Sequence, residues 1–339
     1  MSTKIVIAGI AGASLGTEIA KSLALHGDKY EVYGTDISPL AYGHHQGGFK
    51  KTFTVSRNDY VADISRVLKE NDIKVLIPGG EEPMNLLAPH AAEFAKNGTL
   101  FAGNDPAVVA TCGDKDKCFK ALRDIGTAMP RTLAPAADAE VDAFPFPAIV
   151  KPATGSGGSA FVFLAQDAAE AKPYITYIRN NGRQPLLQEY VPEAEGEYTV
   201  GVLSLPDGEV WGAIAMRRLF QSKLSVLMRA KAGLISSGYS QGLIRPEPAI
   251  EKTCIDIAKA MGSKGPFNVQ GRVKNGALLP FEINPRFSAS TYLRAMAGFH
   301  EIDAYICALL KQPVPAAAKP LAGYYLRTLS ETFVPEGAA

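Results

Sequence analysis

The sequence predicts a mixed α/β and α+β protein, in which an N-terminal parallel-sheet domain precedes a part with several successive strands. At about 150 residues per domain, a length of 339 residues indicates roughly two domains, or one domain with subdomains. Short apolar runs alternate with helical patterns over residues 1–112, which is typical of a parallel sheet covered by helices. Beyond residue 113 several strands follow one another, and Asn275-Gly276 is a strong hairpin signal.

The N-terminal elements are expected in strand–helix order. Residues 5–8 form an apolar run that predicts the first strand, and Leu15, Ile19 and Leu23 recur at the spacing of one helix face. The other elements expected here are strands at residues 31–34, 75–77 and 99–102, and helices at residues 61–68 and 86–94.

The rest of the chain carries its own start and stop signals. Asp114 is a helix N-cap residue, and Gly126 and Pro130 end the helix that follows it. Asp167 and Glu170 have the spacing of a capping box before another helix. A further helix is expected at residues 250–261, and strands are expected at residues 147–150, 161–164, 186–190, 198–205, 210–216, 267–273, 278–284 and 323–329.

The composition excludes several classes of protein. Lys and Arg number 35 against 34 Asp and Glu, which gives a net charge of +1, and the absence of a basic block argues against a nucleic-acid binder. No apolar run approaches the about 20 residues of a membrane-spanning helix, and the first residues read as a strand rather than a signal peptide. We therefore expect a cytoplasmic protein without membrane contact. The four cysteines form no CxxC pair, so we expect reduced thiols that are mostly buried, and no zinc site.

A first glycine cluster follows the first strand. Gly9, Gly12 and Gly16 open a helix, and Asp36 ends the second strand, which resembles a dinucleotide fingerprint. The spacing is G-x-x-G-x-x-x-G rather than G-x-G-x-x-G. That mismatch favours a glycine turn that packs strand against helix over a nicotinamide site.

A second glycine cluster follows Lys151. The segment 151–159 reads KPATGSGGS, and its glycines leave backbone amides free to approach an anion while the lysine supplies a point charge. The alternative is a flexible hairpin loop, and the motif by itself leaves both interpretations open. Further on, the strand end at residues 188–191 can offer backbone groups to a purine edge, and Glu197 can accept hydrogen bonds from ribose hydroxyls. A solvated acidic turn is the alternative there.

The sharpest signal is the run Glu282-Ile283-Asn284-Pro285-Arg286. Glu282 and Asn284 share one face of a strand because alternate residues point the same way. Oxygen ligands on one face suit Mg²⁺, and Gln270 on the preceding strand offers a third. Arg286 lies just beyond, where it can hold a charged oxygen. A hydrogen-bond network without metal is the alternative.

The metal face depends on the register of the hairpin. A two-residue turn at Asn275-Gly276 places Lys274 opposite Ala277, which sets Gln270 opposite Phe281 and away from the metal face. A three-residue loop pairs Lys274 with Leu278 and sets Gln270 opposite Glu282 and Asn268 opposite Asn284. We therefore predict the three-residue loop.

In this order the motifs resemble the ATP-grasp family, in the branch of carbamoyl-phosphate synthetase and biotin carboxylase. The resemblance includes Asp114-Lys115 with Gly126 and Pro130 downstream, the glycine loop after Lys151, residues 188–191 with Glu197, and the Gln270 to Arg286 run. It implies a pre-ATP-grasp domain over residues 1–112, a small ATP-grasp subdomain with the glycine loop over 113–190, and a large subdomain with the metal site over 191–339.

The resemblance also implies roles for individual residues. ATP would be held by residues of the first three motifs, with Mg²⁺, or Mn²⁺ in its place, on the metal face and Arg286 at the transferred phosphoryl group. A neutral Gln270 where many relatives carry an acid, and Ala289 in place of an expected glycine, depart from the family pattern. The implied ATP-binding residues are Lys115, Lys151, Gly155, Ser156, Gly157, Gly158, Gln188, Glu189, Tyr190, Val191 and Glu197, and the implied metal ligands are Gln270, Glu282 and Asn284.

The function that follows is an ATP-dependent carboxylate–amine ligase that forms an amide or peptide bond with release of ADP and phosphate. Arg217, Arg218 and Arg229 fall where the family folds a substrate-covering segment, and Ser288 lies close to Arg286; surface salt bridging is the alternative for the arginines. The partners expected are a small carboxylic acid and an amine, whose identities the sequence does not indicate, and a second copy of the chain in a homodimer. Two other functions stay open: an NAD(P)-dependent oxidoreductase on the N-terminal fold, and a nucleotide-binding protein without turnover.

Overall fold

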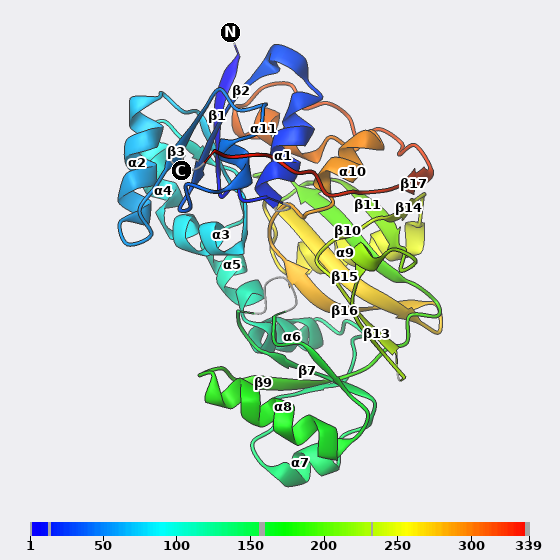
Figure 1. Ribbon diagram of the computed structural model, residues 1–339. Helices are drawn as coiled ribbons and strands as arrows, with labels where there is room; N and C mark the ends of the chain where they lie inside the picture. Colours follow the sequence, from blue (N-terminus) through cyan, green and yellow to red (C-terminus); the bar gives the residue numbers. More distant parts are fainter. Residues whose placement is uncertain (1, 13–14, 156–159, 232, 336–339) are drawn as a thin grey trace.

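The computed structural model describes residues 2–12, 15–155, 160–231 and 233–335. Figure 1 shows a parallel sheet with its helices at the N-terminal end of the chain, a small lobe that projects from the body, and a large antiparallel sheet beside the N-terminal part. This arrangement confirms the predicted fold class. The domain boundaries expected from the sequence stay a prediction.

The N-terminal sheet has five parallel strands in the order β3-β2-β1-β4-β5. Its edge strand β3 was not predicted, because its sequence KTFT is only half-buried and lacks an apolar run. The predicted helix at residues 86–94 is two helices joined by a 3-10 turn at Pro89, since proline cannot continue an α-helix. The strands are β1 (Thr3–Ala8), β2 (Tyr30–Asp36), β3 (Lys51–Thr54), β4 (Val75–Pro78) and β5 (Leu100–Phe101), and the helices are α1 (Leu15–Ala24), α2 (Tyr60–Glu70), α3 (Glu81–Leu87), α4 (Ala91–Lys96) and α5 (Pro106–Gly113).

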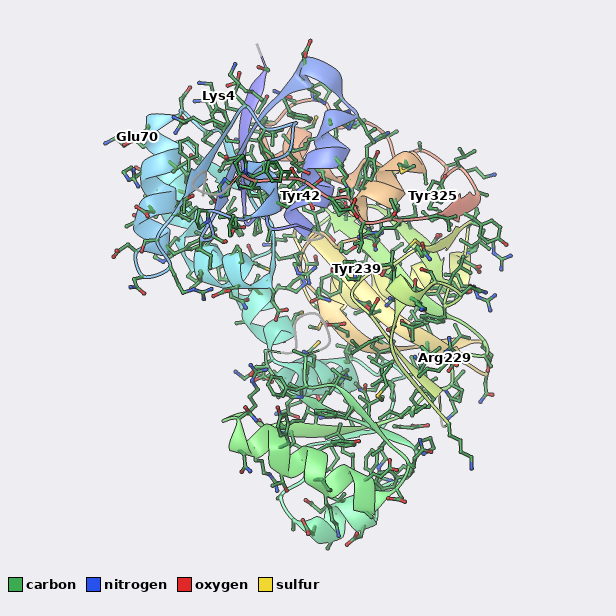
Figure 2. All side chains as sticks on the ribbon, in the orientation of Figure 1. Lys4, Tyr42, Glu70, Arg229, Tyr239 and Tyr325 are labelled. Carbon is green, nitrogen blue, oxygen red and sulfur yellow. The ribbon has the colours of Figure 1, made fainter. Side chains whose placement is uncertain are left out.

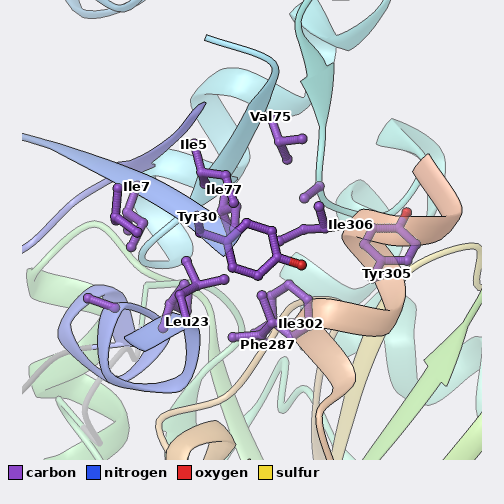
Figure 3. Close-up of a cluster of buried hydrophobic side chains, with 14 of the residues drawn as sticks. Ile5, Ile7, Leu23, Tyr30, Val75, Ile77, Phe287, Ile302, Tyr305 and Ile306 are labelled. Atoms are coloured by element: carbon purple, nitrogen blue, oxygen red, sulfur yellow. The ribbon is translucent and has the colours of Figure 1, made fainter. Parts of the chain in front are cut away.

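One face of this sheet shares a core with the C-terminal part of the chain. Figure 3 shows Ile5 and Ile77 from the sheet and Leu23 from α1 close to side chains of helix α11 (Glu301–Leu309). Tyr305 of α11 is almost fully buried in the same cluster. Helix α11 therefore joins the N-terminal sheet and the large sheet in one core, which also includes Leu203.

The small lobe is a four-stranded sheet in the order β6-β9-β7-β8. Helix α6 (Lys115–Asp124) leads into it, and Asp114 caps that helix as predicted by accepting from the backbone amides of Asp116 and Lys117. The elements of the lobe are β6 (Thr132–Leu133), α7 (Asp138–Asp142), β7 (Ala148–Pro152), β8 (Phe163–Ala165), α8 (Ala168–Asn180) and β9 (Pro185–Glu189).

The large sheet has six strands in the order β16-β15-β10-β11-β14-β17, all paired antiparallel. Helix α9 (Pro248–Ala260) packs its apolar residues on one face of this sheet, and the opposite face carries polar residues. The predicted final strand is shorter than expected, and helix α10 (Thr291–Met296) and α11 were not predicted. The strands are β10 (Glu197–Ser204), β11 (Val210–Arg218), β14 (Gly242–Ile244), β15 (Pro266–Lys274), β16 (Ala277–Asn284) and β17 (Gly323–Tyr325), and β12 (Val226–Ala230) and β13 (Gly233–Ser236) form a separate hairpin.

The prediction of a three-residue loop between β15 and β16 was wrong. Lys274 pairs with Ala277 across a two-residue turn, because Asn275 (φ +54°) and Gly276 (φ +75°) both adopt the left-handed conformation that such a turn requires. A β-bulge at Gln270/Gly271 then shifts the register by one residue, and Gln270 pairs with Glu282 after all. The expected alignment of Gln270 with Glu282 exists, but a bulge rather than a longer loop creates it, and the metal site itself stays a prediction.

All four cysteines are buried and free, as predicted. No helix in the described part of the chain is long and apolar enough to cross a membrane.

Candidate active site

Seven polar side chains stand on the face of the large sheet that faces away from α9, and all of them line one cavity. They occupy alternate positions along three neighbouring strands, so the period of two sends them to the same side. The small lobe closes the cavity from the opposite side, with Lys151 of β7 and Gln188 of β9. The seven residues are Glu197 and Thr199 of β10, Asn268, Gln270 and Arg272 of β15, and Glu282 and Asn284 of β16.

Strand register arranges this face in three successive rows. Neighbouring rows are two residues apart along a strand, which is about 7 Å. The site therefore has a long axis that runs along the strands. The rows are Glu197 with Arg272, then Thr199 with Gln270 and Glu282, then Gly201 with Asn268 and Asn284.

Lys151 is a buried cation at the end of β7. Its Nζ donates to Oε1 of Gln188 at 2.8 Å and to the carbonyl of Phe281 at 2.9 Å. Burial, and then the nearby charge of Lys115, lower the pKa of Lys151 to about 7, while Glu282 opposes that shift. An anion bound beside the two lysines would restore the charged form, so this end of the cavity is suited to phosphate.

Glu197 lies between two arginines in the first row. It is fully buried, and its carboxylate accepts from Nη1 of Arg218 at 3.0 Å and from Nε of Arg272 at 2.8 Å. Arg272 also donates to the carbonyls of Val191 at 2.7 Å and Leu234 at 2.9 Å. The triad thus fastens the segment that leads out of the small lobe, and the β12–β13 hairpin, to the large sheet. Each carboxylate oxygen retains a second lone pair for a ligand.

The side chains of Gln188 and Glu189 are bonded within the protein. The amide of Gln188 accepts from Lys151 and donates to Oγ1 of Thr132 at 2.9 Å. The carboxylate of Glu189 accepts from Lys274 at 2.6 Å, a bond that lowers the pKa of Glu189. What residues 188–191 offer to a planar ligand is therefore chiefly backbone.

The second and third rows hold the predicted metal ligands. Glu282 contributes one carboxylate, and Gln270 and Asn284 contribute amide oxygens. No group of three or more His, Cys, Asp or Glu in the described chain could hold a metal ion. A carboxylate with two amide oxygens on one face is a donor set for a hard cation such as Mg²⁺.

Arg286 and Ser288 extend the site beyond the third row. Arg286 donates from Nη2 to Oδ1 of Asn284 at 3.3 Å and from Nη1 to the carbonyl of Phe287 at 2.9 Å. The hydroxyls of Ser288 and Ser290 are 2.7 Å apart. Glu81, at the start of α3, reaches the same end from the N-terminal sheet and lines the cavity with them.

The three arginines expected to cover a substrate do not line the cavity. Arg217 pairs with Tyr198, which points to the opposite face from Glu197. Arg218 is buried but bonded to Glu197. Arg229 is exposed on β12, and Figure 2 shows it on the hairpin away from the centre of the molecule. Among these substrate candidates, Ser288 is the one the structure brings to the site.

Part of the second glycine cluster can be described. Gly155 adopts φ +68°, a conformation that favours glycine, and its carbonyl accepts from Arg183. Ser156, Gly157 and Gly158 lie outside the described residues.

The first glycine cluster is explained by packing. A Cβ on Gly16 would lie 1.8 Å from the carbonyl oxygen of Gly9, so helix and strand could not approach as they do. The carboxylate of Asp36 accepts from the amides of Ile10 at 2.9 Å and Ser38 at 3.1 Å. These bonds hold the turn, which agrees with the interpretation as a glycine turn.

Sequence reasoning missed several residues of the site, among them Thr199, Asn268, Arg272 and Glu81. Arg272 follows Gln270 by two positions, so strand alternation could have placed it on the same face. Asn268 was considered only for register, and the alternation places it there too. Glu81 has no signal of this kind, because it comes from a different sheet and reaches the cavity only through tertiary packing.

A family model and curated relatives both resemble part or most of this chain. A family model described as "ATP-grasp in the biosynthetic pathway with Ter operon" matches residues 182–332. The carbamoyl phosphate synthase large chain of Methanosarcina barkeri is 25% identical over 294 residues, which covers 82% of this chain and 25% of the relative. The chain thus spans about a quarter of the length of the curated relatives that it matches.

Solved structures share the fold. An N5-carboxyaminoimidazole ribonucleotide synthetase (purK) in complex with ADP has a TM-score of 0.68 at 16% identity, over 95% of this chain and 80% of that one. The L-amino acid ligase from Bacillus licheniformis has a TM-score of 0.66 at 14% identity, over 91% and 74%. The family match over residues 182–332, the carbamoyl phosphate synthase relatives and these structures all agree with the resemblance to the ATP-grasp superfamily.

Proposed function

We propose that the chain is an ATP-dependent ligase that activates a carboxylate as an acyl phosphate and joins it to an amine, with release of ADP and phosphate. The observation that carries the proposal is the order of groups along the site. A row with buried Glu197 and a row of hard-cation ligands follow one another on one sheet face, and the half-buried Arg286 lies just beyond the end of β16. ATP laid along this axis would present its terminal phosphate to a substrate near Arg286.

ATP is held between the small lobe and the large sheet in this proposal. Lys115 and Lys151 bind its phosphates under the glycine loop, and the lowered pKa of Lys151 supports an anion at that place. Residues 188–191 hold the adenine through their backbone, and Glu197 accepts from the ribose. The purK and 2-oxoglutarate carboxylase structures with this fold were solved with ADP.

Gln270, Glu282 and Asn284 would hold Mg²⁺, and the same donors accept Mn²⁺. When bound, the ion neutralises charge on the phosphates.

The chemistry proceeds in two displacements. A carboxylate oxygen of the acid attacks the terminal phosphorus, the bond to the bridging oxygen breaks, and ADP leaves with the electron pair. The amine nitrogen then attacks the acyl carbon, the carbon–oxygen bond to phosphate breaks, and the nitrogen loses a proton as the amide forms. Arg286, fixed by its bond to Asn284, stabilises the negative charge that develops on the transferred phosphoryl group.

The test is a screen of paired acids and amines with coupled detection of ADP. ADP should appear when both substrates are present, or slowly with the acid alone. The products AMP and pyrophosphate would contradict the proposal, because they indicate an acyl adenylate. ATP binding with no ADP for any pair would favour a binding protein, and a change in nicotinamide absorbance would favour the oxidoreductase.

A further inference from the structure

Arg183 lies where helix α8 of the small lobe ends. The amide of Arg183 donates to the carbonyl of Ile178 at 3.2 Å, and the amide of Gly182 donates to the carbonyl of Arg179 at 2.9 Å. Gly182 has φ +69°, so α8 ends in a Schellman motif, in which the residue after the glycine has a defined place. The helix end therefore fixes the backbone of Arg183 before the chain enters β9.

The segment after Arg183 runs beside the end of β7, the strand that carries Lys151. The carbonyl of Gln184 accepts from the amide of Ala153 at 2.9 Å, and the carbonyl of Ala153 accepts from the amide of Lys115 at 2.9 Å. Backbone hydrogen bonds thus connect the neighbour of Arg183 to both lysines that are proposed to bind phosphate, to one through its strand and to the other through its amide.

The guanidinium of Arg183 contacts both sides of the second glycine cluster. It donates from Nη1 to the carbonyl of Gly155 and lies over the ring of Phe161, with 4.5 Å between Cζ and the ring centroid. A Cβ on Gly155 would lie 3.2 Å from Nη1, so a side chain there would crowd this contact. One side chain thus bridges residues on either side of segment 156–159.

Phe161 has a backbone conformation that a bulky residue seldom adopts. Its φ is +59°, in the left-handed region that favours glycine. The ring also lies beside that of Tyr177 on α8, with centroids 5.7 Å apart, and packs against the core of the small lobe. Strained positions persist only where their surroundings hold them, and they cluster at ligand-binding sites. Arg183 and Tyr177 therefore impose this geometry on the residue that follows the glycine cluster.

We propose that Arg183 is a positioning residue for the phosphates of the nucleotide, because it fixes the distance between the two sides of the second glycine cluster. This inference rests on the proposed function for the place of the phosphates. Arg183 is not among the described residues that line the site cavity, so it acts through Gly155 and Phe161 rather than by touching the nucleotide. A segment whose ends are fixed loses less conformational entropy when it orders around an anion, which strengthens binding.

Three substitutions and one control separate this role from others. Arg183→Ala removes both contacts, and Phe161→Leu removes the ring while it keeps an apolar side chain. Arg183→Lys keeps the positive charge but loses the planar fork that stacks and donates at once, so it distinguishes positioning from attraction of phosphate over a distance. The matched control is Arg179→Ala in the same lobe, because Arg179 also donates to a backbone carbonyl, that of Pro135 at 2.6 Å.

The experiment measures the Kd of Mg·ADP by titration calorimetry and the Kd of adenosine by ligand-observed NMR. Adenosine lacks phosphates, so it reports whether the base site and the lobe are intact, and the midpoint of thermal unfolding reports the same where adenosine binds too weakly. We expect Arg183→Ala and Arg183→Lys to bind Mg·ADP at least about fivefold more weakly than wild type. The Kd of adenosine should stay within twofold, and Arg179→Ala should match wild type for both ligands.

Phe161→Leu tests the contact from its other side, and it also serves if neither Arg183 variant folds. It should weaken Mg·ADP by a factor similar to that of Arg183→Ala. The double variant should lose no more than the larger single loss, because the two residues act through one contact.

Mg·ADP affinity within twofold of wild type in Arg183→Ala would overturn the inference, as would an equal loss for adenosine, full recovery in Arg183→Lys or a wild type that binds no Mg·ADP. ADP release from acid–amine pairs judges the proposed function separately. Binding of Mg·ADP that depends on Arg183, without ADP release from any pair, would sustain the inference and refute the ligase. ADP release that needs acid and amine, with the same KM for ATP in wild type and Arg183→Ala, would do the reverse.

Discussion

Glu282 lies directly opposite Gln270 only because the β15–β16 ladder contains a bulge. From Lys274 to Gly271 the strands follow the register set by the two-residue turn, and that register alone would turn Gln270 away from Glu282. The extra residue is Phe281, and its carbonyl accepts from Lys151. One irregularity thus brings Gln270 and Glu282 together and supplies an acceptor for Lys151, the lysine proposed to bind phosphate, which agrees with the frequent occurrence of bulges beside active sites.

The first prediction concerns proton uptake by Lys151. Its pKa of about 7 in the free protein means that at pH 8 only about one-tenth of the lysines carry a proton, and a bound phosphate would raise the pKa. We expect Mg·ADP to take up close to one proton at pH 8, and its Kd to weaken as the pH rises from 7 to 9. Below pH 7 the lysine is already charged, so uptake by this group should vanish. Titration calorimetry in buffers of different ionisation enthalpy measures the proton.

Lys151→Ala supplies the matching variant. It should bind Mg·ADP more weakly and without the proton uptake seen at pH 8. A variant with the same affinity and the same uptake as the wild type would remove Lys151 from the nucleotide site.

The second prediction compares the loss of a charged ligand with the loss of a neutral ligand on the predicted metal face. Glu282→Ala removes the carboxylate of the predicted ligand set and should lower Mg²⁺-dependent ADP release by at least about 100-fold. Gln270→Ala removes a neutral oxygen and should cost about tenfold or less. Rates measured against MgCl2 concentration test the difference. A larger loss for Gln270→Ala than for Glu282→Ala would contradict the assigned roles.

The sequence predicts those features of the site that depend on neighbours within one strand, and it does not predict those that depend on distant segments. Glu282 and Asn284, or Asn268 and Gln270, share a face by strand alternation, which any two-residue spacing reveals. The bulge has no such sequence signal, because one extra residue in a strand resembles ordinary strand sequence. It can be recognised only when the pairing with the neighbouring strand is known.

The substrate arginines show the same limit. Arg217 and Arg218 are neighbours on β11, so their side chains point to opposite faces of the sheet and cannot both face the cavity. Arg218 lies on the face of Glu197 and forms an ion pair with it. The contacts of Arg272 with the Val191 and Leu234 carbonyls join segments 81 and 38 residues away from it in the chain. Contacts of this range depend on tertiary packing and have no spacing signature. The same holds for Glu81, which reaches the cavity from the N-terminal sheet.

The third prediction concerns Asp36, which the alternative oxidoreductase function would place on a ribose. Its carboxylate accepts from two backbone amides of the first glycine turn, and its side chain is buried. Asp36→Ala leaves both donors without that acceptor and should lower the free energy of unfolding by about 1–3 kcal/mol. The Kd for Mg·ADP should stay within twofold, because the nucleotide is proposed to bind between the small lobe and the large sheet. Chemical denaturation and calorimetry measure the two quantities, with Asp36→Asn as the control that keeps one acceptor. A loss of nucleotide affinity without a loss of stability would move the nucleotide to the N-terminal sheet and revive the dinucleotide interpretation of Gly9 to Gly16.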